Sequence, residues 1–420
     1  MSTKFIGSLE KDLNIEPLPT SATLSIAFHV VILLVVIYIL VWACILINHT
    51  ITTPDPPLGW YKRDYDADKI SRLSLTEYVK ANAAAIPNTT PMIQFAVATA
   101  CFGGIFTETR NMYNPWLGNV NPEAARRQVE AGARAILLDV WPDPNTRAPV
   151  VCSMEDSQEW GMWWRNNGLD KRVGQYSNWK KLTRNTAPIK SIVSAALGAA
   201  FEDGPQKSDP FFLILHLHGA MTKEYLNTLG DIIDGILKEQ GVNTLATSSY
   251  RDDQSSSTPF KTYPYTEFQH KLTIIVVPDI QPGYNILPNI NTYAGFSAVF
   301  MPTTLGQMTN VLEKTRKTVM FEPSDKLMVS APNPACATAG QEATPPTLPE
   351  TGFCIIRPST GGKSTDNDDF YKKDSSYTDC LLTGAQFVAV NLFSKNDDDT
   401  VLQTFFDNKY FGKYSFVKLK

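Results

Sequence analysis

The longest apolar stretch of the chain lies near its beginning. Residues 24–47 contain no Asp, Glu, Lys or Arg, and they are numerous enough to cross a bilayer as one helix. The polar residues 1–23 lack the basic region of a secretory signal, and no small-residue cleavage site follows the apolar stretch. We therefore expect a polar tail followed by a single-pass membrane anchor, with the bilayer as its partner.

A Pro-rich stalk at 48–74 separates the anchor from a body at 75–420. In the body, short apolar runs typical of buried strands alternate with segments whose apolar positions repeat at helical spacing. The predicted strands are 92–99, 135–141, 149–154, 211–218, 272–277, 296–300, 326–331, 387–393 and 414–419. The predicted helices are 122–133, 189–201, 222–239, 304–318 and 400–408. This alternation favours an α/β fold, a (β/α)8 barrel of the TIM type, with polar loops inserted at 247–264, 332–352 and 361–378.

The run AGARAILLDVW at residues 131–141 carries a single acid, Asp139, near its carboxyl end. Barrel enzymes place their chemistry at the carboxyl ends of the strands, so Asp139 is a candidate site residue. The alternative is that Asp139 only caps the loop that follows the strand. Spacing alone favours this second interpretation.

Composition excludes two classes of function. The formal net charge is −4, so the chain lacks the basic excess that a nucleic-acid surface needs. None of the six cysteines forms a C-x-x-C pair, so a zinc ribbon or a thioredoxin-type site has no support.

Several motifs resemble those of phosphatidylinositol-specific phospholipase C. The family strand G-x-R-x-x-E-L-D-x-W is matched by Gly132, Arg134, Leu138, Asp139 and Trp141. Further segments resemble family strands in the same order along the chain, at 149–151, 213–218, 384–391 and 405–418. The closer resemblance is to membrane-anchored phospholipase-C-like proteins of large DNA viruses and some protists. It implies a phospholipase-C-like barrel held in a virion or host membrane.

The resemblance also implies that the catalytic groups are replaced. In the phospholipases, one imidazole transfers protons and a second stabilises the transition state. The first of these His positions falls at Cys101, and the second falls near Ser153. A thiol acts as a base only when its pKa is strongly lowered, and no Lys, Arg or His adjoins Cys101 in sequence.

Most of the calcium ligands implied by the resemblance are replaced as well. Calcium takes oxygen ligands, but the family Asn falls at Phe102 and a family Glu falls at Leu137. A further family Glu falls at His218, whereas the family Asp is kept as Asp139. The resemblance therefore assigns no cofactor to this chain with the ligands that remain.

The strand sequence L-H-L-H suggests a candidate pocket. His216 and His218 are two residues apart on the strand, so they project to the same face, which we expect to be the barrel interior. Asp139 should point into the same space, with Glu155 at its rim. Two imidazoles and a carboxylate suit a transition metal such as zinc. The favoured alternative is that both His side chains are structural and are hydrogen-bonded to Asp139 and to backbone groups.

Two functions remain open. The first is a catalytically degenerate binding or structural protein on a membrane, whose partner is a phospholipid headgroup or another protein. The second is an active phosphodiesterase with a rebuilt site, acting on phosphoinositide or glycerophosphodiester substrates. The first is favoured because paired catalytic groups, once lost, are hard to replace one at a time.

Overall fold

The computed structural model describes residues 20–51, 73–107, 117–143, 146–156, 179–202, 206–218, 223–245, 263–278, 294–301, 318–321, 353–357, 385–393 and 411–419. The chain divides into two compact units, Met1–Asp64 and Tyr65–Lys420. The first unit contains helix α2, Thr20–Ile51, which extends beyond the predicted span at both ends. Its stretch Ser25–Trp42 is exposed and is long and apolar enough to cross a membrane, features that a signal sequence shares.

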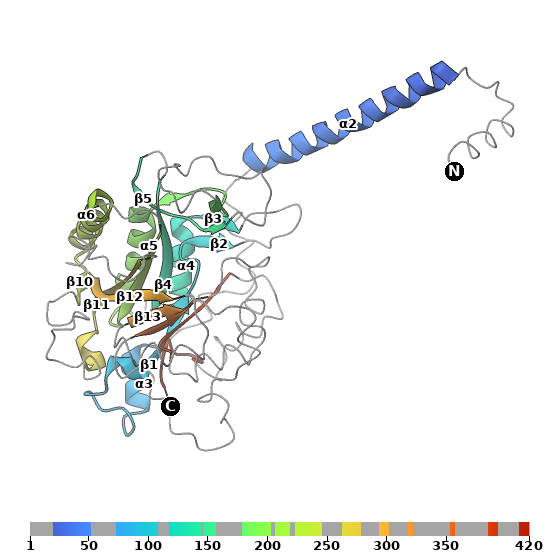
Figure 1. Ribbon diagram of the computed structural model, residues 1–420. Helices are drawn as coiled ribbons and strands as arrows, with labels where there is room; N and C mark the ends of the chain where they lie inside the picture. Colours follow the sequence, from blue (N-terminus) through green and yellow to red (C-terminus); the bar gives the residue numbers. More distant parts are fainter. Residues whose placement is uncertain are drawn as a thin grey trace. The chain divides into compact units, whose positions relative to one another are not determined.

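The second unit is built on a curled parallel sheet (Figure 1). Its parallel strands are β1 Phe95–Ala100, β4 Ala135–Pro142, β9 Phe211–Leu217, β11 Lys271–Pro278, β12 Ala294–Met301, β13 Thr318–Phe321, β14 Cys354–Ile356 and β15 Phe387–Val390. Each strand in this series pairs in parallel with the next, and β15 pairs with β1. The carboxyl ends of the strands therefore meet at one end of the sheet, as in a TIM-like barrel.

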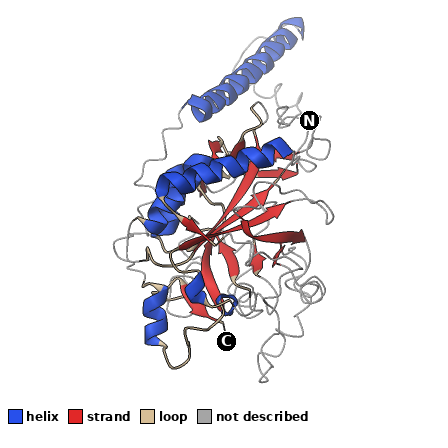
Figure 2. Cartoon of the chain, turned by 90° about the vertical axis from the view of Figure 1, so that its left-hand side faces the viewer, coloured by secondary structure: helices blue, strands red, loops and turns tan. Residues whose placement is uncertain are grey.

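In the described part of the chain, helices lie beside part of this sheet. They are α4 Pro122–Glu130, α5 Ile189–Phe201 and α6 Lys223–Gln240, which lie between consecutive parallel strands in sequence. Figure 2 shows long helices lying against the strands. The predicted helix 400–408, the predicted strand 326–331 and most of the predicted helix 304–318 lie outside the described residues. So do the predicted loops 332–352 and 361–378, and nearly all of 247–264.

Two predicted strands run differently from the parallel series. The segment predicted at 149–154 divides into β5 Pro149–Val151, antiparallel to β4, and the start of β6 Met154–Asp156, which pairs with β7 Trp179–Lys181. The segment predicted at 414–419 contains β16 Phe416–Lys418, antiparallel to β1. Hydrophobic alternation predicts that a segment is a strand, but it does not specify the direction of its neighbour.

Smaller elements complete the described part of the fold. Strand β8 Ala187–Pro188 extends the sheet beyond β5, and β10 Asn243–Thr244 pairs with β11. A hairpin formed by β2 Ile105–Thr107 and β3 Gly118–Val120 follows β1. Short helices are α3 Leu75–Ala81, η2 Met92–Gln94 and η8 Tyr265–Glu267.

Side chains alternate between two hydrophobic clusters, one on each face of the sheet. Leu137 and Ile214 belong to the cluster that fills the interior of the curled sheet. Their neighbours Ile136 and Leu213 belong to the other cluster, which includes Ile192 of α5. Successive residues of a strand point to opposite faces, so every second residue after Leu137 and Ile214 also points inward.

Arg134 stabilises the start of β4 from a fully buried position. Its guanidinium donates hydrogen bonds to the carbonyl oxygens of Ala200 at 3.3 Å, Pro210 at 3.3 Å and Asp209 at 3.1 Å. These carbonyls belong to the end of α5 and to the turn before β9. The Arg of the family-like motif is therefore a structural residue that ties one helix end to two strands.

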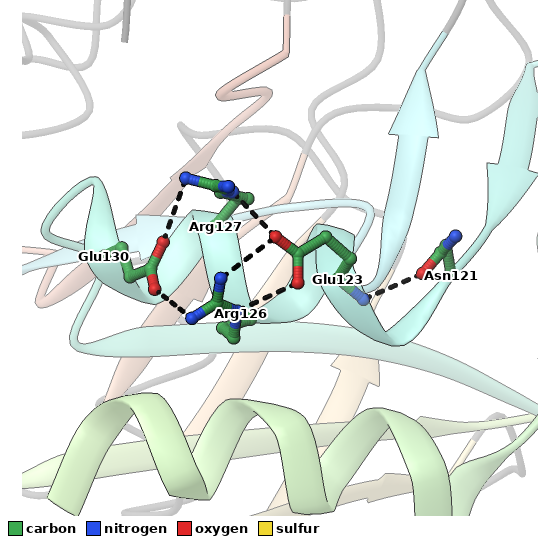
Figure 3. Close-up of polar contacts among 5 residues, drawn as sticks. All are labelled: Asn121, Glu123, Arg126, Arg127 and Glu130. Atoms are coloured by element: carbon green, nitrogen blue, oxygen red, sulfur yellow. Dashed lines mark hydrogen bonds and ion pairs between the residues drawn. The ribbon is translucent and has the colours of Figure 1, made fainter. Parts of the chain in front are cut away.

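Helix α4 carries an ion-pair network on its half-exposed face (Figure 3). Asn121 caps the helix by accepting a hydrogen bond from the backbone N–H of Glu123 at 2.8 Å. Arg126 and Arg127 each bridge Glu123 and Glu130, with distances between 2.8 and 3.5 Å. Such pairs contribute only about 0.3–0.5 kcal/mol each on a helix surface, so the network gives α4 modest support.

Candidate functional site

A polar cluster lies inside the curled sheet, near the carboxyl ends of its strands. Asp139 lies near the end of β4 and is directly opposite His216 of β9 in the parallel register. His218 follows β9, and Arg357 is the first residue after β14. The four side chains are between 2% and 6% exposed, so the cluster is shielded from water.

One carboxylate oxygen is the centre of the cluster. Oδ1 of Asp139 lies 2.9 Å from Nε2 of His218, 2.9 Å from Nη1 of Arg357 and 3.1 Å from Nδ1 of His216. Nη1 of Arg357 also contacts Nδ1 of His216. The ring of His218 is stacked on Trp141, with 4.2 Å between centroids and 5° between planes.

These contacts assign the protons of both imidazoles. A guanidinium can only donate, so Nδ1 of His216 must be the acceptor toward Arg357 and its ring is neutral. His218 donates its Nε2–H to the carboxylate of Asp139. The cluster therefore consists of one buried ion pair, a neutral imidazole and a donating imidazole.

The pKa values agree with this assignment. Burial raises the pKa of Asp139, but the charge of Arg357 and the contacts with His216 and His218 outweigh it and hold this pKa well below its usual range. Burial and the neighbouring His218 lower the pKa of His216 to about 3. His216 is therefore neutral and Asp139 is ionised at physiological pH.

The cluster has the donor set of a metal site, but the guanidinium of Arg357 already occupies it. Ligand atoms of Asp139, His216 and His218 all lie within 4.8 Å of one another. Arg357 donates to the carboxylate oxygen and to the imidazole nitrogen that a metal would need. Calcium, which takes about six to eight oxygen ligands, does not fit a cluster with one carboxylate that is already paired.

Cys101 and Phe102 stand where the resemblance places the first catalytic His and a calcium-binding Asn. Neither side chain takes part in the hydrogen bonds described for this cluster. Cys101 lies within electrostatic range of Arg357 and Asp139, but burial raises its pKa well above the ordinary thiol value. Phe102 has a left-handed backbone with φ 51° and is buried in the cluster that faces the helices. Gln128 of α4 holds this turn by donating to the carbonyl oxygens of Cys101 and Phe102. Cys101 is therefore a poor base.

Among the described side chains at the other expected positions, those of Leu137 and Ser153 add no hydrogen bond to the cluster. Leu137 lies on the inner face of β4 and contributes only apolar surface. Ser153 is fully buried, and its backbone carbonyl accepts a hydrogen bond from the N–H of Leu182 at 2.8 Å. Glu155 lies on β6 opposite Lys180, and its side chain is outside the described part of the structure.

Sequence patterns did not single out Arg357. Its strand, β14, lies between the predicted loops at 332–352 and 361–378, where no strand was predicted. The available signal was the short apolar run FCII at 353–356, followed at once by a cation. A run of this length at the end of a long loop is too short to identify a strand by periodicity.

No protein-family model matches the sequence, and no curated protein matches it. Among solved structures, L. pealei PLC21 is similar with 12% identity and a TM-score of 0.50, over 83% of this chain and 38% of that chain. S. officinalis PLC21 is similar with 11% identity and a TM-score of 0.50, over 79% of this chain and 37% of that chain. A calcium-dependent phosphoinositol-specific phospholipase C from Pseudomonas sp. is similar with 11% identity and a TM-score of 0.41, over 79% of this chain and 97% of that one.

These likenesses define the class of fold. The curled parallel sheet matches the TIM-like barrel of phosphatidylinositol-specific phospholipase C structures. The alignment covers 38% and 37% of the two PLC21 chains, so it extends over well under half of those proteins. At 11–12% identity the likeness establishes the fold alone.

Proposed function

We propose that this chain is a membrane-anchored, phospholipase-C-like (β/α)8 barrel without phospholipase C activity, which serves as a binding or structural protein. The exposed apolar helix α2 supports the anchor, and the polar tail before it favours an anchor over a signal sequence. We propose, from the resemblance of its motifs, that the chain is akin to the membrane-anchored phospholipase-C-like proteins of large DNA viruses and protists. A virion or host membrane is then the location, and the partner is a phospholipid headgroup or a protein.

The observation that carries this proposal is the ion pair between Arg357 and Asp139. In a catalytic cluster, a carboxylate at this position is available to a metal or to the substrate. Here its Oδ1 accepts from Arg357 at 2.9 Å and from His218 at 2.9 Å, inside a cluster that excludes water. The cluster therefore satisfies its own charges without a ligand.

Proton transfer is disfavoured for a related reason. General acid–base catalysis is most efficient when the pKa of the catalytic group lies near the operating pH. His216 has a pKa of about 3, and Cys101 has a pKa raised well above its ordinary value. Neither group changes its protonation state near neutrality.

The test is a phospholipase C assay on the full-length chain reconstituted in vesicles that contain phosphatidylinositol. We expect no release of inositol phosphate above that of an Asp139→Asn variant, with or without calcium. Soluble glycerophosphodiesters should likewise not be hydrolysed. Calcium-dependent release that disappears in Asp139→Asn would contradict the proposal.

The second candidate is an active phosphodiesterase with a rebuilt site. One observation favours it: a carboxylate and two imidazoles converge within hydrogen-bonding distance at the strand ends, where barrel enzymes act. This candidate requires hydrolysis without calcium. Release of product that persists in a chelator and disappears in His218→Gln would favour it over the first.

A further inference from the structure

The first described residues of the barrel unit lie at the opposite end of the sheet from the polar cluster. The N–H of Leu73 donates to the carbonyl of Lys413 at 2.7 Å, and Gln206 donates to the carbonyl of Leu73 at 3.1 Å. Gln206 also donates to the hydroxyl of Ser415 at 2.9 Å. The N–H of Leu75 donates to Oδ1 of Asp209 at 2.8 Å. We refer to these contacts of Leu73, Leu75, Gln206, Asp209 and Ser415 as the base clasp.

The base clasp holds helix α3 as a plug in the amino-terminal end of the sheet. Leu75 and Val79 of α3 are buried in the interior cluster together with Phe95 and Phe416. A capping box starts the helix, because Ser74 accepts from the backbone of Glu77 and Glu77 accepts from the backbone of Ser74. Release of α3 would expose the apolar interior to water at the amino-terminal end of the sheet.

Asp209 is the unusual member of the clasp. Its side chain is 0% exposed, and its Oδ2 has no hydrogen-bond partner among the described residues. The guanidinium of Arg134 is close, but it donates to backbone carbonyls, among them that of Asp209 itself. An ionised carboxylate is costly in such a place, whereas a neutral carboxyl group is tolerated.

We propose that Asp209 makes the docking of α3 dependent on pH, with the clasp closed most firmly when the carboxyl group is neutral and loosened as it ionises. Two charged groups face Asp209 from the elements packed against it. Arg134, before β4, attracts the carboxylate, and Glu77 of α3 repels it. Helix α3 would then be held more loosely at neutral than at acidic pH.

The direction follows from linkage. Burial, together with the charge of Glu77, raises the pKa of Asp209 to about 7, against the opposing effects of Arg134 and the Leu75 N–H. In an open clasp the carboxyl group meets water, where its pKa is about 3.9. Between these two values the closed state binds more protons, so the open fraction rises by close to tenfold per pH unit and levels off above about pH 7.

Hydrogen exchange of the Leu75 amide tests the proposal, because this N–H donates directly to Asp209. The full-length chain in detergent micelles is labelled between pH 4 and pH 8, with the amides of α6 as an internal reference. Base catalysis alone raises the exchange rate of an amide by about tenfold per pH unit. The opening of the clasp adds to this, so the exchange rate of Leu75 in the wild type should rise by close to a hundredfold per pH unit up to about pH 7. Asp209→Asn, which cannot ionise, should show only about tenfold.

A second variant keeps the test decisive if Asp209→Asn does not fold. Glu77→Gln preserves the capping box, because Gln is also found at that position, but it removes the charge that repels Asp209. The pH at which the extra slope ends should therefore shift downward. Equal slopes in wild type and Asp209→Asn, or an unshifted limit in Glu77→Gln, would overturn the proposal.

Discussion

At the scale of single residues, the cluster around Asp139 balances its own charge. Arg357 supplies one positive charge and Asp139 one negative charge, while His216 stays neutral because it accepts a hydrogen bond from Arg357. Burial strengthens each of these interactions and also makes each partner costly to leave alone. The effects of removing one partner or both partners should therefore differ.

Replacing Arg357 with Met should destabilise the fold by about 3–5 kcal/mol, because the carboxylate of Asp139 would remain buried without its cation. The double variant Asp139→Asn/Arg357→Met should recover part of this loss, since no unpaired charge remains. Denaturant unfolding of both variants measures the difference. A double variant less stable than the single one would show that the charge balance is not what holds the cluster together.

Removing Arg357 should also create a metal site. In Arg357→Ala, the ligand atoms of Asp139, His216 and His218 lose their competing cation but remain within reach of one ion. Zinc at about a hundredfold excess over its Kd should then stabilise the variant by about 2.7 kcal/mol, seen as a raised Tm. The wild type and an Arg357→Ala/His218→Ala control should show no such rise.

At the scale of elements, the sequence predicted those with strong periodicity. Helix α5 begins and ends at the predicted residues, β4 and β9 differ from prediction by one residue at one end, and β11 is one residue longer at each end. The short β14 was missed because three residues between long loops carry no periodic signal. Strand alternation was enough to predict that Asp139, His216 and His218 lie together. The position of Arg357 could not be predicted, because it depends on how β14 pairs in the sheet.

The turn after β1 depends on a glycine that sequence patterns did not single out. Gly104 has φ +73°, and a Cβ there would lie 2.7 Å from a methyl carbon of Ile192. Gly104→Ala should destabilise the fold by about 1–3 kcal/mol, since it adds backbone strain and overlap with α5. Gly241→Ala is a matched control, because it also has a positive φ of +63° but meets no atom within 4 Å. A similar loss in both would mean that backbone strain alone accounts for the effect.

At the scale of the whole molecule, the chain divides between an apolar helix and a barrel unit. The residues of Tyr65–Lys420 form one compact unit, and the parallel strands described in it all begin at or after Phe95. None of these strands therefore requires the first unit as a pairing partner.

Removal of residues 1–52 should leave a soluble, folded protein with the same unfolding midpoint as the full chain in detergent. The deletion takes away helix α2 and its exposed apolar side chains, which account for the need for detergent. Circular dichroism and size-exclusion chromatography measure the outcome. Aggregation or loss of ordered structure would place the boundary of the barrel unit earlier in the chain.

Two buried groups give the barrel opposing responses to acid. The pKa of His216 is lowered to about 3, so its unfolded form, with a pKa of about 6.5, binds more protons and stability falls as pH drops through this window. The pKa of Asp209 is raised to about 7, so the native state binds more protons and stability rises as pH falls toward about 4. In the wild type, the contributions of His216 and Asp209 to the pH dependence of the free energy of unfolding should largely cancel between about pH 4 and pH 6.5.

Single substitutions should therefore uncover each slope. In Asp209→Asn only the His216 contribution remains, and the free energy of unfolding should decrease by up to about 1.4 kcal/mol for each pH unit of acidification. In His216→Gln only the Asp209 contribution remains, and the change should have the opposite sign. Urea unfolding at a series of pH values measures both, with the Asp209→Asn/His216→Gln double variant as the flat reference. If both single variants kept the wild-type pH profile, the two groups would have to titrate alike in the folded and unfolded chains, contrary to their burial.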